Sequence, residues 1–322
     1  MRGTPGAVRA LTVAVVLLGT AAQGLVAQGT SNSGLVAARG TTGMVSSAHP
    51  AATEVGLRML ARGGTAFDAA VAVAAALNVV EPMMSGMGGY GTILVYSARE
   101  ERSRFLNPSG RIPRAVDSDQ YRAPTPGYME NRRGAKAVST PGNVNAWAAM
   151  HEAYGALPWE DLFRPAIALA EEGFVVDERI AGLIAEAFDD FPEHARAFYG
   201  RDGRPLTPGD RLIQLDLARS FGVVAAEGPE AFHGGRLGRA IEQAMREADG
   251  FLRLADLEQN EAEWWEPITI EYRGHTVVTA PPPANSFPAL VRLGLMSRFD
   301  VASMGHNSAD YLHTFAETTK HA

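Results

Sequence analysis

The sequence contains no cysteine, and this absence excludes several kinds of chemistry. Disulfide bonds, zinc sites built from thiolates, a cysteine nucleophile and a lipid attached to an N-terminal cysteine are all ruled out. The sequence also lacks a His-Glu-x-x-His metal motif and a Gly-x-Ser-x-Gly nucleophile motif. His306 and His313 lie two helical turns apart, which favours exposed or hydrogen-bonded histidines over a shared metal site. No metal site is therefore expected.

Basic residues are outnumbered by acidic ones, and the formal net charge is −7 at pH 7. A general nucleic-acid binder neutralises many phosphates, so nucleic acid is not an expected partner. The content of 46% hydrophobic and 20% charged residues is typical of a globular protein that buries a core. The 322 residues suffice for one large domain or two small ones.

The N-terminus has the pattern of a secretory signal peptide. Arg2 and Arg9 supply a positive region, residues 10–18 form an apolar stretch with Thr12 as its one polar residue, and small residues allow cleavage after Ala22 or Ala27. The apolar stretch is short for a membrane span and no charged stop follows it, although an uncleaved anchor is the alternative. Export to the periplasm or secretion is expected, with no attachment to the membrane after cleavage.

The glycine-rich stretch 85–91 is the centre of the pattern. A helix over 66–80 precedes it, nearly all Ala, Val and Leu and therefore buried on all sides, and an apolar strand over 92–96 follows. Dinucleotide-binding motifs require strand, glycines and helix in that order, so this order predicts a tight turn instead. Thr65 and Asp68 fit a capping box at the start of the helix, which makes Asp68 a cap and not a catalyst.

The remaining pattern alternates helices with a few scattered strands, which predicts a mixed α and β protein built in layers. Runs of β-branched and apolar residues predict strands at 43–47, 104–107, 134–139, 268–272 and 275–279. Proline and glycine residues predict a loop-rich surface region at 189–210. Apolar spacing and start and stop residues predict helices from Pro50 to the Gly63-Gly64 pair and at 143–154, 159–172, 177–188, 212–226, 237–248, 251–260, 286–299 and from 309 onward.

Two places carry candidate binding residues. Arg111 and Arg114 follow a glycine turn, and their guanidinium groups can form bidentate hydrogen bonds with a carboxylate, or both can be ordinary surface arginines. Glu261, Glu263 and Glu266 surround a pair of tryptophans and can flank a sugar, but the polar entrance to a strand is the better interpretation.

An ordered set of motifs resembles the γ-glutamyltranspeptidase family, also called glutathione hydrolases. The motifs run through nearly all of the expected exported part, and each is weak alone: Met44–Pro50, Gly63–Ala70, Glu81-Pro82, Ser85–Gly91, Thr140-Pro141-Gly142, Tyr154-Gly155, Ala168–Phe174, Tyr272-Arg273-Gly274 and Pro281–Pro283.

The resemblance implies an αββα sandwich of the N-terminal-nucleophile hydrolase type, incomplete in this chain. It implies a precursor that cuts itself, so that a new N-terminal threonine on a small subunit attacks γ-glutamyl amides such as glutathione, with its own amine as base and without a cofactor. That threonine is expected beyond this chain. Residues 1–27 are then a signal peptide, 28–40 a linker, and 41–322 part of a large subunit that is inactive alone.

The sequence departs from the family at two places. The family's arginine for the substrate carboxylate lies in an Arg-Glu-x-Ala-Pro pattern, and aligning its proline with Pro113 puts Ser109 at that position. Arg111 lies on the same face of an extended segment, displaced by roughly 6–7 Å, and is the expected substitute. Phe287 stands where the family's Pro-Ser-Ser-Gly-Gly pattern has glycine.

Three functions are compatible with this pattern. The first is a γ-glutamyl hydrolase or transferase whose Arg111 binds the substrate carboxylate. The second keeps the fold but acts on another acyl amide, which Ser109 and Phe287 favour. The third is a non-catalytic exported protein that only binds a ligand or partner, which the missing nucleophile favours.

Overall fold

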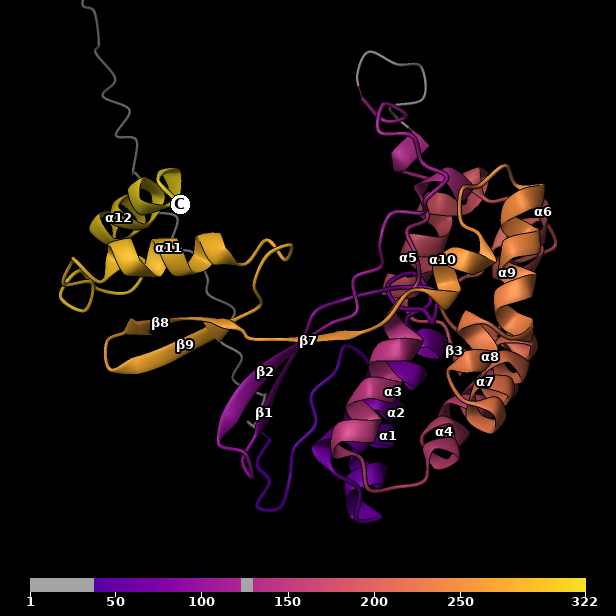
Figure 1. The fold of residues 1–322 in the computed structure, drawn as a ribbon, viewed down its shortest axis with the longest axis horizontal. Coiled ribbons are helices and arrows are strands. Elements are labelled where there is room, and N and C mark those ends of the chain that lie inside the picture. Colours follow the sequence, from indigo (N-terminus) through magenta and orange to yellow (C-terminus); the bar gives the residue numbers. More distant parts are fainter. Residues whose placement is uncertain (1–37, 123–129) are drawn as a thin grey trace, which may run out of the picture. The chain divides into compact units, whose positions relative to one another are not determined.

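The computed structural model describes residues 38–122 and 130–322. The expected signal peptide, 1–27, and most of the expected linker, 28–40, lie outside the described residues. Residues Thr42–Ala322 form one unit by their mutual contacts, and this unit is described here (Figure 1). Within the described ranges no helix combines the length and apolar character that crossing a bilayer requires.

Helices α1 (Pro50–Ala61) and α2 (Ala66–Val80) pack against each other and form the centre of the core. Thr65 and Asp68 form the predicted capping box, and α2 has the predicted bounds. The side chain of Asp68 also accepts the backbone N–H of Ala156, at 3.0 and 3.2 Å to its two oxygens. Asp68 is therefore a buried cap that joins α2 to the loop before α4, as its position in the motif predicted.

Three further helices extend this core: α3 (Asn143–Tyr154) and α4 (Trp159–Glu172) pack against α2, and α7 (Leu215–Glu227) packs against α4. Helix α4 contacts both α2 and α7, and aromatic rings fill the space between them. Phe163 lies 6.0 Å from Phe221 and 6.3 Å from Trp147 between ring centroids. Burial of such large apolar side chains is the main stabilising contribution to this layer.

The principal sheet is antiparallel, with strand order β1 (Ile93–Ser97), β2 (Arg102–Asn107) and β7 (Glu263–Trp265). Its register pairs Asn107 with Glu263 and Phe105 with Trp265. The strand interpretation of the Glu-Trp-Trp segment is thus confirmed. β7 leads along the chain into the hairpin β8 (Ile268–Tyr272) and β9 (His275–Thr279), which has the predicted bounds.

The other elements are shorter or lie outside the core. They are β3 (Phe174–Val175), α5 (Glu178–Ala187), α6 (Glu193–Tyr199), β4 (Gly200–Arg201), β5 (Arg204–Pro205), β6 (Arg211–Leu212), α8 (Glu230–His233), α9 (Arg236–Glu247), α10 (Leu254–Glu258), α11 (Phe287–Met296), α12 (Ala309–Lys320) and the 3-10 turns η2 (Ala135–Ala137) and η3 (Phe188–Asp190). Helix α11 lies along β8 and also contacts α12 (Figure 1).

Two predicted strands are wrong. Residues 43–47 form no strand, because no neighbouring strand pairs with them in the described part of the chain; Val45 instead packs against Gly56 of α1. Residues 134–139 contain the 3-10 turn η2, because Gly134 has a φ of 83° and the N–H of Ala137 donates to the carbonyl of Gly134.

Two regions between helices also differ from the prediction. Residues 189–210 contain α6 and the β4–β5 pair besides loops, and the ring of Tyr199 at the end of α6 packs 5.4 Å from that of Phe191. The helix predicted from residue 212 begins at Leu215, because Leu212 pairs with Phe174 in a short ladder. The late start of α7 comes from a contact between residues distant in sequence, whereas the β4–β5 pair in 189–210 joins residues that are close along the chain.

Candidate functional site

Two extended segments cross at the end of β2 and set the backbone of the site. A Cβ atom added to Gly110 would lie 1.5 Å from the carbonyl oxygen of Thr140, and one added to Gly142 would lie 1.8 Å from that of Pro108. Only glycine permits so close an approach of two backbones. The N–H of Thr140 donates to the carbonyl of Arg111 at 3.2 Å. The crossing therefore fixes the backbone on both sides of Gly110.

Arg111 follows directly on this crossing. Its backbone is held, but its side chain is 79% exposed and its Nη2 lies 3.3 Å from Oε1 of Glu263. The contact follows from the sheet, because β7 places Glu263 opposite Asn107, four residues before Arg111. The predicted candidate is thus an anchored residue with a guanidinium that reaches solvent.

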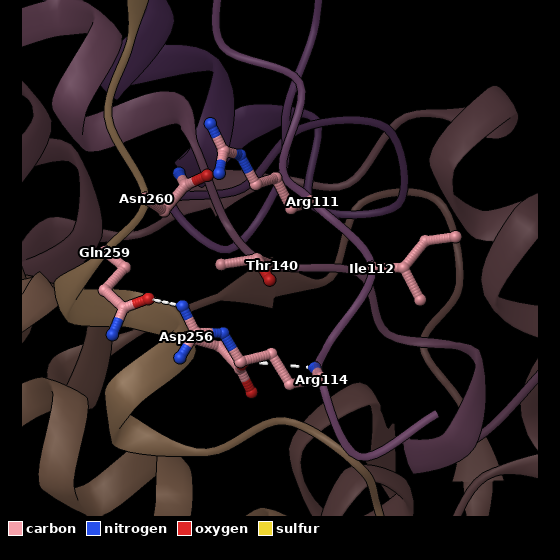
Figure 2. Close-up of a pocket in the computed structure, with 7 residues that line it drawn as sticks. All are labelled: Arg111, Ile112, Arg114, Thr140, Asp256, Gln259 and Asn260. Atoms are coloured by element: carbon pink, nitrogen blue, oxygen red, sulfur yellow. Dashed lines mark hydrogen bonds between the residues drawn. The ribbon is translucent and has the colours of Figure 1, made fainter. Parts of the chain in front are cut away.

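Both predicted arginines line one small cavity. The cavity has a volume of about 60 Å³. Figure 2 shows the residues that line it: Arg111, Ile112, Arg114, Thr140, Asp256, Gln259 and Asn260. This volume holds a few water molecules or a carboxylate-sized group, but not a whole glutamyl residue.

Arg114 is held by the segment that contains α10. Its backbone N–H donates to Oδ1 of Asp256 at 3.1 Å, and its guanidinium donates to Oε1 of Gln259. Oδ2 of Asp256 accepts the N–H of Arg253 at 3.0 Å. Arg114 is thus joined to the α10 segment through both its backbone N–H and its guanidinium, whereas the contact of Arg111 with Glu263 involves its side chain alone.

Asn260 is a residue of the site that the sequence did not single out. It is 5% exposed, and its Nδ2 donates to the carbonyl of Pro141 at 2.9 Å. The backbone carbonyl of Asn260 accepts a hydrogen bond from Nδ2 of Asn145 on α3. Asn260 therefore ties the end of the α10 segment to the crossing. Its only signal in the sequence is an asparagine after a short helix, which is common in turns.

Thr140 is also buried, and its hydroxyl has no hydrogen-bond partner among residues 38–122 and 130–322. A buried hydroxyl without a partner is unfavourable, typically by about 1–3 kcal/mol. The cavity beside it is polar and large enough for water, which could satisfy this group.

His233 forms a buried contact with the α10 segment. The ring is buried in α8, and its Nδ1 lies 3.2 Å from the carbonyl of Leu257 on α10, to which it donates. Desolvation lowers the pKa of His233 from 6.5 to about 4, and the hydrogen bond to Leu257 opposes this shift. His233 is therefore neutral at pH 7 and acts as a structural contact.

A second hollow lies beside β1 and β2, near the position where the sequence departs from the expected glycine. It has a volume of about 330 Å³ and is lined by Thr92, Leu94, Phe105, Thr279, Ala280, Ala284, Asn285 and Ser286. Phe287 follows as the first residue of α11 and is 44% exposed. Its ring is free to contact a ligand, which a glycine at this position could not do.

No group of three or more potential metal ligands comes together in residues 38–122 and 130–322. The histidines considered from the sequence, His306 and His313, are both exposed.

The comparisons with known proteins agree with this architecture. The profile of the gamma-glutamyltranspeptidase family matches residues 52–322. The chain is 37% identical over 294 residues to the acylase ACY 1 proenzyme of Pseudomonas sp. strain V22, covering 88% of this chain and 52% of that protein. It is 33% identical over 292 residues to the glutathione hydrolase proenzyme of Escherichia coli K12, covering 88% and 50%. The chain thus spans about half the length of the curated relatives it matches.

A solved structure matches in three dimensions. The gamma-glutamyltranspeptidase of Helicobacter pylori superposes with a TM-score of 0.84 at 27% identity, covering 88% of this chain and 83% of that chain. The expected layered α/β fold of the N-terminal-nucleophile hydrolase type is therefore confirmed. From its sequence, its fold and the residues matched, the chain belongs to the gamma-glutamyltranspeptidase family.

Proposed function

We propose that this chain is the large-subunit part, residues 41–322, of an exported precursor that cleaves itself and then hydrolyses or transfers γ-glutamyl groups. Membership of the family supports this proposal, as does the fact that both curated relatives are named proenzymes. Residues 1–27 direct export to the periplasm or beyond. The partner of the chain is then a small subunit from the same precursor.

The chemistry that we propose needs no cofactor. The N-terminal threonine of the small subunit attacks the carbonyl carbon of the γ-glutamyl amide, and its own α-amine accepts the hydroxyl proton. The resulting oxyanion is stabilised by backbone N–H donors, and the amine leaves with a proton. Water or an acceptor amine then resolves the acyl-enzyme. The contribution of the present chain is to bind and orient the substrate.

Arg111 carries this proposal. Its backbone is fixed by the crossing at Gly110, and its guanidinium is largely exposed beside a cavity that admits a carboxylate. A guanidinium binds a carboxylate through two parallel hydrogen bonds. We infer that Arg111 binds the α-carboxylate of the γ-glutamyl group in place of the arginine that the family pattern has at the position of Ser109.

The test is the Arg111→Ala substitution in the complete protein. We expect a rise in KM for γ-glutamyl-p-nitroanilide of about 10- to 100-fold, because a charge-assisted hydrogen-bonded contact contributes roughly 1.5–3 kcal/mol. Self-cleavage should be slowed much less. The matched control is Arg102→Ala, which removes another exposed arginine that pairs with a glutamate near the same sheet. An unchanged KM in Arg111→Ala would refute the role of Arg111.

A second function has specific support. The acylase ACY 1 relative is 37% identical, and both Ser109 and Phe287 depart from the γ-glutamyl pattern. On this alternative the substrate is another acyl amide, and the ring of Phe287 contacts an apolar acyl chain. The ratio of kcat/KM for γ-glutamyl-p-nitroanilide to that for butyryl-p-nitroanilide distinguishes the two: a ratio above one supports the first function, and a ratio below one supports the second.

A further inference from the structure

Glu263 is the carboxylate that faces Arg111. Its Oε1 lies 3.3 Å from Nη2 of Arg111, and its Oε2 accepts the indole N–H of Trp265 at 2.9 Å. The two oxygens of Glu263 thus have different donors, and Trp265 holds the carboxylate in the orientation in which it meets the arginine. The other carboxylate of the site, Asp256, accepts backbone N–H groups of Arg114 and Arg253 instead.

We infer that Glu263 lowers the preference for anionic acyl groups by competing with the carboxylate of the substrate for Arg111, an inference that rests on the proposed function. A substrate carboxylate that binds Arg111 displaces Glu263 or shares the guanidinium with it. In either case two negative charges approach each other, and the gain from binding an anionic acyl group is reduced. An uncharged acyl group meets no such competition.

The competition is weak enough to be overcome. The side chain of Arg111 is 79% exposed and that of Glu263 is 42% exposed, so water screens their attraction. Exposed ion pairs of this kind change an equilibrium by a factor of about one to five. Glu263 therefore reduces the preference for anionic acyl groups without preventing their binding. The substrate class that follows is broad: acyl amides with a terminal carboxylate and uncharged acyl amides of similar length.

Three anilide substrates separate the contribution of the acyl carboxylate to KM from that of the amine. The γ-glutamyl group carries a carboxylate and an amine, the glutaryl group carries the same carboxylate without the amine, and the butyryl group has neither. Glu263→Gln keeps the shape of the side chain and an oxygen that can accept from Trp265, but removes the charge. We expect it to lower KM for the γ-glutamyl and glutaryl anilides by about two- to five-fold, with kcat and the KM for the butyryl anilide unchanged.

The matched control is Glu266→Gln. Glu266 lies just beyond the end of β7 and pairs with Arg102 at 2.7 Å, so it should move none of the three KM values. The effect of Glu263→Gln should also vanish when Arg111 is replaced by alanine, because a double-mutant cycle isolates the interaction between the two residues. Equal changes of KM for charged and uncharged anilides, or an undiminished effect in the Arg111→Ala background, would overturn the inference.

Binding of glutarate provides a test that does not depend on turnover. Isothermal titration calorimetry on the complete protein should show a lower Kd for glutarate in Glu263→Gln than in the wild type, and no change in Glu266→Gln. If glutarate binds more tightly to Glu263→Gln while no anilide is cleaved, the competition stands and the proposed reaction fails. If anilides are cleaved and the Kd does not change, the reaction stands and the competition is refuted.

Discussion

Gly110 and Thr140 are in such close backbone contact that a Cβ at residue 110 would lie 1.5 Å from the Thr140 carbonyl oxygen. The obstacle is backbone and not the end of a flexible side chain, so it can be relieved only by moving one of the two segments. Arg111 comes directly after this contact. The position of the proposed carboxylate-binding residue therefore depends on a glycine that lies against the backbone of Thr140.

Gly110→Ala should destabilise the protein by about 1–3 kcal/mol or more, because overpacking forces the backbone to shift. Since the shift moves Arg111, the KM for γ-glutamyl-p-nitroanilide should also rise. Thermal unfolding and steady-state kinetics measure the two effects. Gly182→Ala is the control: this glycine lies in α5 with no atom within 4 Å of an added Cβ, and alanine there should stabilise the helix by about 0.5–1 kcal/mol. Equal stability of the two variants would contradict the tight crossing.

Asn260→Ala should destabilise the protein by about 1–3 kcal/mol, because the carbonyl of Pro141 loses a buried hydrogen bond. The KM for γ-glutamyl substrates should rise as well, since the crossing loses its tie to the α10 segment. The matched control is Gln243→Ala, which removes an exposed amide on α9 that hydrogen-bonds to Glu247. A loss of stability no larger than that of the control would show that Asn260 does not hold the site together.

We expect the buried His233 to make the folded protein less stable at acidic pH. Its pKa in the folded protein is about 4, below the ordinary value of 6.5, so the unfolded chain binds the proton more readily. The free energy of unfolding should therefore fall as the pH drops from about 6.5 to about 4, by an amount of the order of 3 kcal/mol. Well above pH 6.5 the residue is neutral in both states and this contribution to the pH dependence vanishes.

His233→Gln should remove most of this dependence, whatever it does to stability at neutral pH. The measurement is the midpoint of denaturant unfolding at a series of pH values between 4 and 7. The exposed His194→Gln variant is the control and should keep the acid-side loss of the wild type. If the slope is the same in His233→Gln and the wild type, the neutral buried imidazole is not its source.

Local patterns were sufficient to predict many of the elements. α2 and α3 were predicted with their bounds, because a capping box and a stop at a glycine are local signals. β8 and β9 were predicted because a two-residue turn joins two β-branched runs. The segment 43–47 was not predicted correctly, since a strand exists only where another strand pairs with it.

The site was only partly predictable for the same reason. Arg111 and Arg114 were found because they lie close together beside a glycine turn. Asn260 and Glu263 were not assigned to them, because they come to the site through the pairing of β2 with β7, more than 140 residues apart in the chain. Neither a hydrogen bond to the Pro141 carbonyl nor an ion pair with Arg111 leaves a pattern within a short stretch of sequence.

The most direct test of the account is the intact mass and N-terminal sequence of the protein isolated from its native source. Two chains are expected. The larger begins after Ala22 or Ala27 and contains residues up to 322, and the smaller begins with threonine. A single uncut chain that retains full activity towards γ-glutamyl-p-nitroanilide, or a second chain that begins with another residue, would contradict the proposed self-cleaving enzyme.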